Sequence, residues 1–112
     1  MKVYNNPSCS KCVTTLALLN DKNISPEIIN YLETPPKGEE LKEIIEKLGI
    51  KPIDLIRKKE NIFQEKYAGK NLSDTAWIEV MIQYPILIER PIIINGNKAV
   101  IGRPPVKVLD II

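Results

Sequence analysis

The sequence of 112 residues contains no histidine. Histidine is the commonest general base and the commonest metal ligand, so neither role can rest on an imidazole in this chain. The two cysteines are too few to complete a four-ligand zinc site without histidine. We therefore expect no metal site and no resident cofactor.

The sequence also lacks a long apolar run and a marked excess of charge of one sign. No apolar segment approaches the roughly 20 residues that a membrane-spanning helix needs. The net charge is only +2, with 16 basic and 14 acidic residues, which does not indicate a nucleic-acid surface. Because the cysteine motif follows almost directly after Met1, we expect no removable signal peptide and a cytoplasmic location.

What the sequence does contain is one Cys-x-x-Cys pair, Cys9 and Cys12. It stands where a short apolar start, Met1 to Tyr4, gives way to a helix-like stretch. The N–H groups and positive dipole end of a helix stabilise a thiolate there, and the thiolate is the reactive form of cysteine. In a reducing compartment such a pair indicates redox chemistry or metal binding rather than a structural disulfide.

Within this motif the two thiols have different expected roles. Cys9, at the helix start, should be the exposed nucleophile, and Cys12, one turn further on, should be its resolving partner. Residues at this spacing lie close enough for a disulfide to bridge them. The alternative interpretation is that the cysteines are incidental, with one of them packed as a small hydrophobic residue.

The first third of the chain predicts a βαβ unit. Met1 to Tyr4 reads as a strand, Ser10 to about Asp21 as a helix, and Ile24 to Tyr31 as a second strand. A Cys-x-x-Cys motif inside such a unit is typical of thioredoxin-like proteins.

The middle of the chain, about residues 35–84, predicts a helical insertion. It begins with the breaker cluster Pro35-Pro36-Lys37-Gly38. An amphipathic helix is expected over Glu39 to Leu48, ending at Gly49, and a helical turn over Ile53 to Ile56. Ser73 or Asp74 could cap a further helix that runs to about Gln83, with three residues facing inward: Trp77, Val80 and Met81.

The end of the chain predicts a β-hairpin followed by a helix. The apolar runs Pro91–Ile94 and Lys98–Ile101 flank Asn95-Gly96, a strong hairpin signal, and a final helix is expected from about Pro105 to Ile112. The predicted fold class is therefore α/β: a single thioredoxin-like domain over residues 1–112, with the helical insertion between the βαβ half and the C-terminal hairpin plus helix.

Three arginines lie near predicted element ends: Arg57, Arg90 and Arg103. The planar guanidinium fork of arginine suits a tetrahedral oxyanion. Taken singly, each arginine is better explained as a solvated surface residue. Pro91, which follows Arg90, reads from the sequence alone as an ordinary first residue of a strand.

Several stretches spread over the chain resemble the glutaredoxin-linked arsenate reductase family. They are Tyr4–Cys9, Tyr31–Pro35, Leu48–Ile50, Leu55–Lys59, Tyr84–Ile92, Gly102–Pro104 and Val108–Ile111. This resemblance implies a thioredoxin-like fold with a helical insertion. It also implies that Cys9 is the nucleophile, that Pro91 is a cis-proline, and that an oxyanion is bound by Arg57, Arg90 and Arg103.

The activity that the resemblance implies is reduction of arsenate to arsenite. Cys9 would form a thiol–arsenate adduct, and glutathione, as co-substrate, together with glutaredoxin would supply the electrons. Where the well-studied reductases have serine, this chain has Cys12. A second route is therefore open, in which a Cys9–Cys12 disulfide forms and is reduced by thioredoxin or glutaredoxin.

With Cys12 as its second cysteine, the motif also resembles that of the Spx-type regulators, which bind RNA polymerase and sense oxidation through Cys-x-x-Cys. In favour of the reductases stands Arg103, within Gly102-Arg103-Pro104-Pro105. Two alternatives to arsenate reduction therefore remain: an Spx-like redox-sensing regulator that binds RNA polymerase, and a thiol–disulfide oxidoreductase with another substrate.

Overall fold

The first unit of the structure is built on a mixed four-stranded sheet. The computed structural model describes residues 1–112, and this unit comprises Met1–Thr34 and Arg90–Ile112. The strands are β1 (Lys2–Asn5), β2 (Glu27–Asn30), β3 (Ile92–Asn95) and β4 (Lys98–Ile101), in the spatial order β2-β1-β3-β4. β1 pairs in parallel with β2 and antiparallel with β3, and β3 pairs antiparallel with β4.

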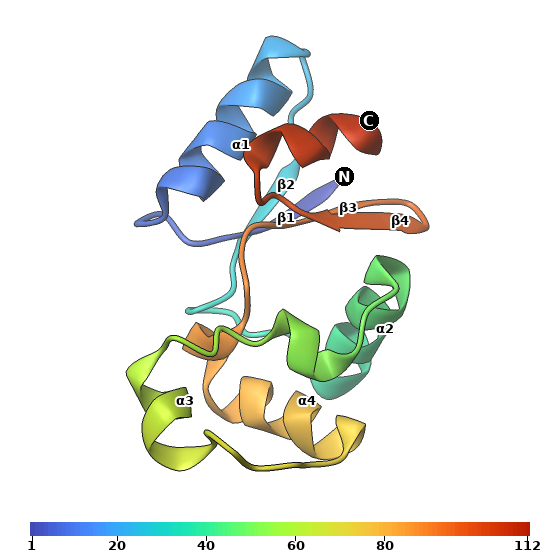
Figure 1. Ribbon diagram of the computed structural model, residues 1–112. Helices are drawn as coiled ribbons and strands as arrows, with labels where there is room; N and C mark the ends of the chain where they lie inside the picture. The colour runs from blue at the N-terminus through green and yellow to red at the C-terminus, as the bar shows by residue number, and fades with distance from the viewer. The chain divides into compact units, whose positions relative to one another are not determined.

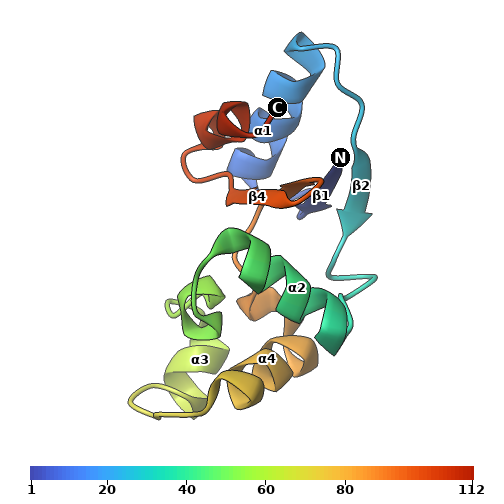
Figure 2. The same cartoon turned by 90° about the vertical axis from the view of Figure 1, so that its right-hand side faces the viewer.

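Two helical segments cover the same face of this sheet. α1 (Ser10–Asp21) connects β1 to β2, and the 3-10 helix η3 (Pro105–Asp110) follows β4. Figures 1 and 2 both show α1 and the red η3 on one side of the strands. The core between them is an apolar cluster of Val3, Leu19, Ile93, Val108 and Ile111. The α/β thioredoxin-like fold class predicted from the sequence is confirmed.

The hairpin forms with its turn one residue later than expected. Asn95 pairs with Lys98 across the hairpin, so the two-residue loop is Gly96-Asn97 rather than Asn95-Gly96. Gly96 has φ +62°, a conformation in which a side chain would be strained. Glycine at the first loop position is typical of a type II′ hairpin turn.

Two further expectations for this unit need correction. The second strand covers only Glu27–Asn30, not Ile24–Tyr31, because Asn23 turns the chain at φ +59° and Pro26 offers no N–H to a ladder. The C-terminal helix is a 3-10 helix that ends at Asp110. Its content of proline and β-branched valine disfavours a regular α-helix.

The second unit, Pro35–Glu89, contains helices and one isolated antiparallel β-bridge, between Ile56 and Ile88. It contains α2 (Gly38–Leu48), the 3-10 turn η1 (Pro52–Leu55), α3 (Asn61–Lys66), α4 (Asp74–Gln83) and the 3-10 turn η2 (Pro85–Leu87). α3, with six residues, is too short to give a clear periodic pattern, and the sequence did not predict it. The expectation of a single domain over residues 1–112 stays a prediction.

Local signals set the ends of the two longer helices. Gly49 ends α2 in the left-handed conformation at φ +69°. Ser73 caps α4, since its hydroxyl accepts a hydrogen bond from the Ala76 N–H at 3.2 Å. The predicted inward face of α4 is buried as expected, and Trp77 stacks on Phe63 with ring centroids 6.0 Å apart.

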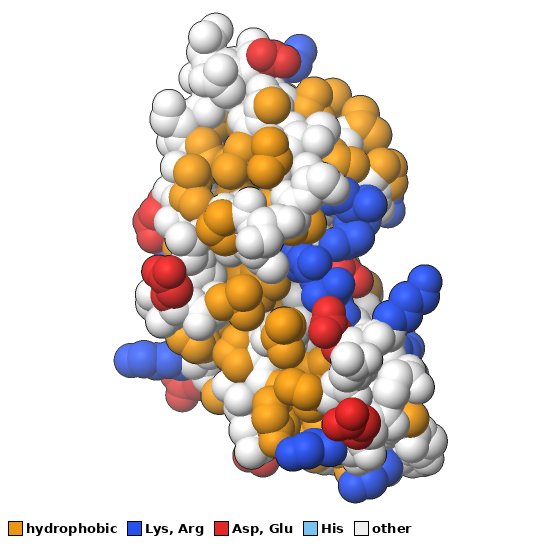
Figure 3. All heavy atoms as spheres, turned by 90° about the vertical axis from the view of Figure 1, so that its left-hand side faces the viewer, with side chains coloured by type: hydrophobic (Ala, Val, Ile, Leu, Met, Phe, Trp, Pro, Cys, Tyr) orange, Lys and Arg blue, Asp and Glu red, His pale blue; other side chains and the backbone are white.

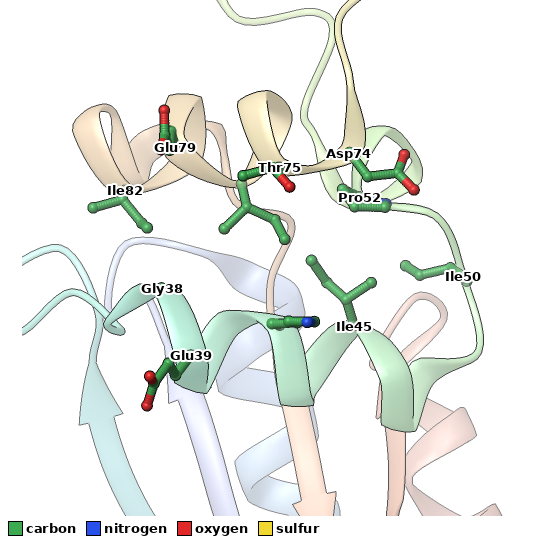
Figure 4. Close-up of a pocket in the computed structure, with 11 residues that line it drawn as sticks. Gly38, Glu39, Ile45, Ile50, Pro52, Asp74, Thr75, Glu79 and Ile82 are labelled. Carbon is green, nitrogen blue, oxygen red and sulfur yellow. The ribbon is translucent and has the colours of Figure 1, made fainter.

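A groove of about 530 Å³ lies between α2 and α4. Ile45, Ile50, Pro52 and Ile82 form part of its apolar wall, and Glu39, Asp74 and Glu79 are among its charged lining residues (Figure 4). At one end Gly38 lies against Ile82, where an added Cβ would stand 3.4 Å from Ile82 Cδ1. The space between the helices is therefore narrow at that end because residue 38 has no side chain.

No helix of the protein combines the length and the apolar character needed to cross a membrane. On the face drawn in Figure 3, hydrophobic side chains form much of the surface, and acidic and basic side chains both occur among them.

Candidate active site

Cys9 occupies the N-cap position of α1. Its backbone is extended, with φ −97° and ψ 119°, and its carbonyl oxygen accepts the first helical hydrogen bond, from the Val13 N–H at 3.1 Å. The usual N-cap residues are serine, threonine, aspartate and asparagine, whose oxygen faces the N–H groups of the second and third helical residues. Here the sulfur of Cys9 takes that place, facing the N–H groups of Lys11 and Cys12.

The loop before Cys9 is fixed by its own hydrogen bonds. The Ser8 N–H donates to Asn6 Oδ1 and the Cys9 N–H donates to the Asn6 carbonyl, both at 3.0 Å. Asparagine side chains commonly close turns in this way. Asn6 therefore sets the direction in which the chain enters α1.

The environment of Cys9 favours its thiolate. Burial alone would raise the pKa of the Cys9 thiol, but the backbone N–H and thiol of Cys12, the Arg90 side chain and the Lys11 N–H together lower that pKa below its ordinary value. The sequence expectation that Cys9 is exposed is wrong, since only 6% of its surface is accessible. Its reactivity depends on these donors rather than on exposure.

Cys12 lies in a different environment, although it is only one turn away. Its side chain is fully buried, and this burial raises the pKa of the Cys12 thiol to about 11. The Asn6 N–H acts in the opposite direction, and the neighbouring Cys9 raises the pKa further. The two thiols of the pair are therefore unequal: the surroundings favour the protonated form of Cys12 and the ionised form of Cys9.

Two of the three predicted arginines lie at this cysteine. The Arg90 side chain hydrogen-bonds the Cys9 sulfur, and Arg103 Nη2 lies 3.8 Å from Cys9 Sγ. Arg103 Nε also donates to the carbonyl of Arg90 at 2.7 Å. The sequence positions 9, 90 and 103 are thereby brought together by the sheet and the first turn of α1.

Backbone contacts tie the two arginine segments to each other. The Gly102 N–H donates to the Pro91 carbonyl at 2.9 Å, directly beside the bond from Arg103 Nε to Arg90. The peptide bonds Arg90–Pro91 and Arg103–Pro104 are both cis. The two hydrogen bonds place Arg90 and Arg103 on neighbouring chain segments at the open end of the β3–β4 hairpin.

Arg57 belongs to the second unit and is held there by acidic partners. Its guanidinium contacts Glu60, and its Nε lies 3.8 Å from Glu89 Oε1. Backbone bonds from the Arg57 N–H to Leu87 and from the Glu89 N–H to Leu55 fix this segment. The part of Arg57 in binding an oxyanion stays a prediction from the resemblance.

Sequence reasoning missed the residues that support these side chains. Glu60 could have been noticed, because it stands three residues after Arg57 and pairs with it. Gly102 carries a weaker signal, a glycine directly before a candidate anion-binding arginine. Thr15, fully buried beside Gly102, carries none, since its role depends on the packing of α1 on the hairpin.

Comparison with known proteins gives consistent matches over nearly the whole chain. Residues 4–111 match the model of the ArsC family. The Escherichia coli protein YfgD, described as uncharacterised, is 42% identical, with 100% of this chain and 96% of that protein aligned. The arsenate reductase of Haemophilus influenzae is also 42% identical, over 98% of this chain and 97% of its own length. The solved structure of an arsenate reductase from Vibrio cholerae superposes with a TM-score of 0.94 at 45% identity, covering 100% and 98% of the two chains.

Proposed function

This chain belongs to the ArsC family, and from that premise we propose that it is a thiol-dependent oxidoreductase that reduces arsenate to arsenite. The observation that carries the proposal is the surroundings of Cys9. Its sulfur stands at the N-terminus of α1 and is contacted by Arg90 and Arg103. A helix N-terminus together with guanidinium groups attracts an anion, and the same donors favour the ionised form of the attacking sulfur.

In the first step the Cys9 thiolate attacks the arsenic atom. A sulfur–arsenic bond forms and one arsenic–oxygen bond breaks, with the departing oxygen taking up protons and leaving as water. Arg90 and Arg103 offset the negative charge of thiolate and arsenate, which would otherwise repel each other. The resemblance assigns Arg57 to the same anion, and we retain that assignment as part of the proposal.

In the second step Cys12 resolves the adduct. Its sulfur attacks Cys9 Sγ and a disulfide forms, while the electron pair of the sulfur–arsenic bond passes to arsenic, which goes from As(V) to As(III). The Cys12 proton passes to the departing arsenite. The Cys9–Cys12 disulfide then takes two electrons and two protons from thioredoxin, or from glutaredoxin and glutathione. Glutathione can replace Cys12 as the attacking thiol, with a mixed disulfide on Cys9 as the product.

The test is a coupled assay of arsenate turnover with two reducing systems run in parallel. One contains glutathione and glutaredoxin, and the other contains thioredoxin and its reductase. We expect turnover by the unaltered protein, none by Cys9→Ser, and a higher KM for arsenate in Arg90→Ala and Arg57→Ala. Cys12→Ser should lose thioredoxin-driven turnover. If Cys12→Ser keeps full activity with thioredoxin, the resolving role of Cys12 is wrong.

The same assay distinguishes the alternatives. A protein that reduces a disulfide substrate fully but does not turn over arsenate is a thiol–disulfide oxidoreductase of another specificity, and the arsenate proposal fails. Capture of RNA polymerase by the oxidised or reduced protein, together with no arsenate turnover, would favour the regulatory alternative.

A further inference from the structure

Gly102 packs where no side chain can fit. An ideal Cβ built on this residue would lie 2.7 Å from Pro91 Cγ and 2.8 Å from Thr15 Oγ1, with Ile93 Cδ1 at 3.3 Å. Neither the proline ring nor a fully buried threonine is the free end of a flexible chain. The φ angle of Gly102 does not lie in the left-handed region. Glycine is therefore required here because of the space available and not because of the backbone conformation.

The Gly102 contact lies beside the hydrogen bonds that hold the two arginine segments together. Gly102 directly precedes Arg103, and its N–H is bonded to the Pro91 carbonyl at 2.9 Å. The side chain of the next residue also bonds this segment, since Arg103 Nε donates to the Arg90 carbonyl at 2.7 Å. These two bonds lie side by side between the segments 90–91 and 102–103. A Cβ at residue 102 would force the segments apart at both bonds.

Thr15 forms the opposite wall of this contact. It lies on α1, one turn after Cys12, and its hydroxyl is buried without a hydrogen-bond partner. A buried hydroxyl with no partner costs free energy instead of adding stability, so what Thr15 contributes here is its shape. α1, which carries both cysteines, is thus in direct contact with the segment that carries Arg103.

We propose that Gly102 is a positioning residue: the absence of a side chain at 102 lets the β4 end pack on Pro91 and Thr15, and this packing holds the Arg103 guanidinium at the Cys9 sulfur. The effect on arsenate turnover rests on the proposed function. The effect on the pH profile of the Cys9 thiol does not. Gly102 itself touches neither the sulfur nor the anion.

The experiment compares Gly102→Ala with Gly96→Ala. Gly96 lies in the turn of the β3–β4 hairpin and Gly102 directly follows β4, so Gly96→Ala strains the hairpin at the end remote from the arginines. Both variants should lower the melting temperature. Only Gly102→Ala should move the pH profile of Cys9 reaction with a small disulfide to higher pH. It should also lower kcat/KM for arsenate by about tenfold to a hundredfold, mainly through KM, as expected for a misplacement of roughly 1 Å.

A second pair of variants tests the contact with Thr15. Adding Thr15→Ala to Gly102→Ala removes the oxygen that the new Cβ would meet. The double variant should therefore show a smaller shift of the pH profile and a smaller rise in the KM for arsenate than Gly102→Ala alone. Adding Thr15→Ser keeps that oxygen and should restore nothing. If Gly102→Ala does not fold, Thr15→Ile in the otherwise unaltered chain presses on Gly102 from the other side and should give the same two changes. Thr15→Val should not.

Equal pH profiles for Gly102→Ala and Gly96→Ala, or for Thr15→Ile and the unaltered protein, overturn the inference. Arsenate turnover that is absent from the unaltered protein would instead count against the proposed function, since the thiol profiles can be measured without arsenate. A shifted thiol profile then still supports the positioning role of Gly102.

Discussion

Replacing Arg90 with methionine should make the Cys9 thiol behave more like an ordinary cysteine. The substitution keeps an extended side chain but removes the charged group that hydrogen-bonds the sulfur. A hydrogen bond to a charged partner contributes about 1.5 to 3 kcal/mol, and each 1.4 kcal/mol is about a tenfold change in an equilibrium. Below the thiol pKa, the fraction of Cys9 present as thiolate should therefore fall by about ten- to a hundredfold.

The measured rate should change less than the thiolate fraction. A thiolate of higher pKa is more nucleophilic, with a Brønsted coefficient of about 0.4 to 0.5 toward disulfides, which recovers about half of the loss on a logarithmic scale. At pH values below the Cys9 pKa of both proteins, we therefore expect Arg90→Met to react with a small uncharged disulfide about three- to tenfold more slowly than the unaltered protein. At pH values above the Cys9 pKa of both proteins, where this thiol is ionised in each, Arg90→Met should react faster than the unaltered protein, so the two profiles cross.

Two matched variants make this result specific. Lys11→Met removes one positive charge from the same helical turn, but only the backbone N–H of Lys11 favours the thiolate. Arg103→Met removes a guanidinium whose contact with the sulfur is long, at 3.8 Å. The expected order of effects is Arg90, then Arg103, then Lys11. A profile for Lys11→Met that equals that of Arg90→Met would refute the reasoning, because net charge alone would then explain the effect.

Three further predictions concern the free energy of unfolding. Burial raises the pKa of the Cys12 thiol from 9.0 to about 11, so the folded protein holds this proton more tightly than the unfolded chain. The free energy of unfolding should therefore fall as the pH rises from 9 to 11, by about 2 to 3 kcal/mol more than in Cys12→Ala. Ser73→Ala removes the acceptor of the Ala76 N–H and should cost about 1 kcal/mol in urea unfolding, whereas Ser73→Asp should not. Gly38→Ala places a methyl group 3.4 Å from Ile82 Cδ1 in ordinary contact, and should raise stability by about 0.4 to 1 kcal/mol in the same assay.

The elements predicted best are those with strong local signals. α4 begins after Ser73 and α2 ends at Gly49, as capping serine and terminal glycine indicate. α3 was missed because six residues give too little periodicity to recognise. The 3-10 form of Pro105–Asp110 was missed because the pattern that marks a buried helical face does not separate 3-10 from α geometry.

The site was predictable only in part, for a similar reason. Cys9 and Cys12 are marked by their spacing and by the helix that follows them, which are local features. The grouping of Cys9 with Arg90 and Arg103 depends on the pairing of β1 with β3 and β3 with β4, and it came from family resemblance rather than from any local pattern. The burial of Cys9 and the space left by Gly102 are consequences of packing, which no single stretch of sequence encodes.

Because Cys9 occupies the N-cap position of α1, the proposed chemistry links the oxidation state of this thiol to the start of that helix. While Cys9 is a thiolate, its charge is balanced by the N–H groups of the first turn and by Arg90. In the proposed Cys9–Cys12 disulfide that charge would be gone, although the donors would remain in place. Stabilising the thiolate therefore favours the dithiol form over the disulfide, which makes the disulfide a stronger oxidant toward its reductant. The arrangement that prepares Cys9 for attack thus also favours its return to the reduced state.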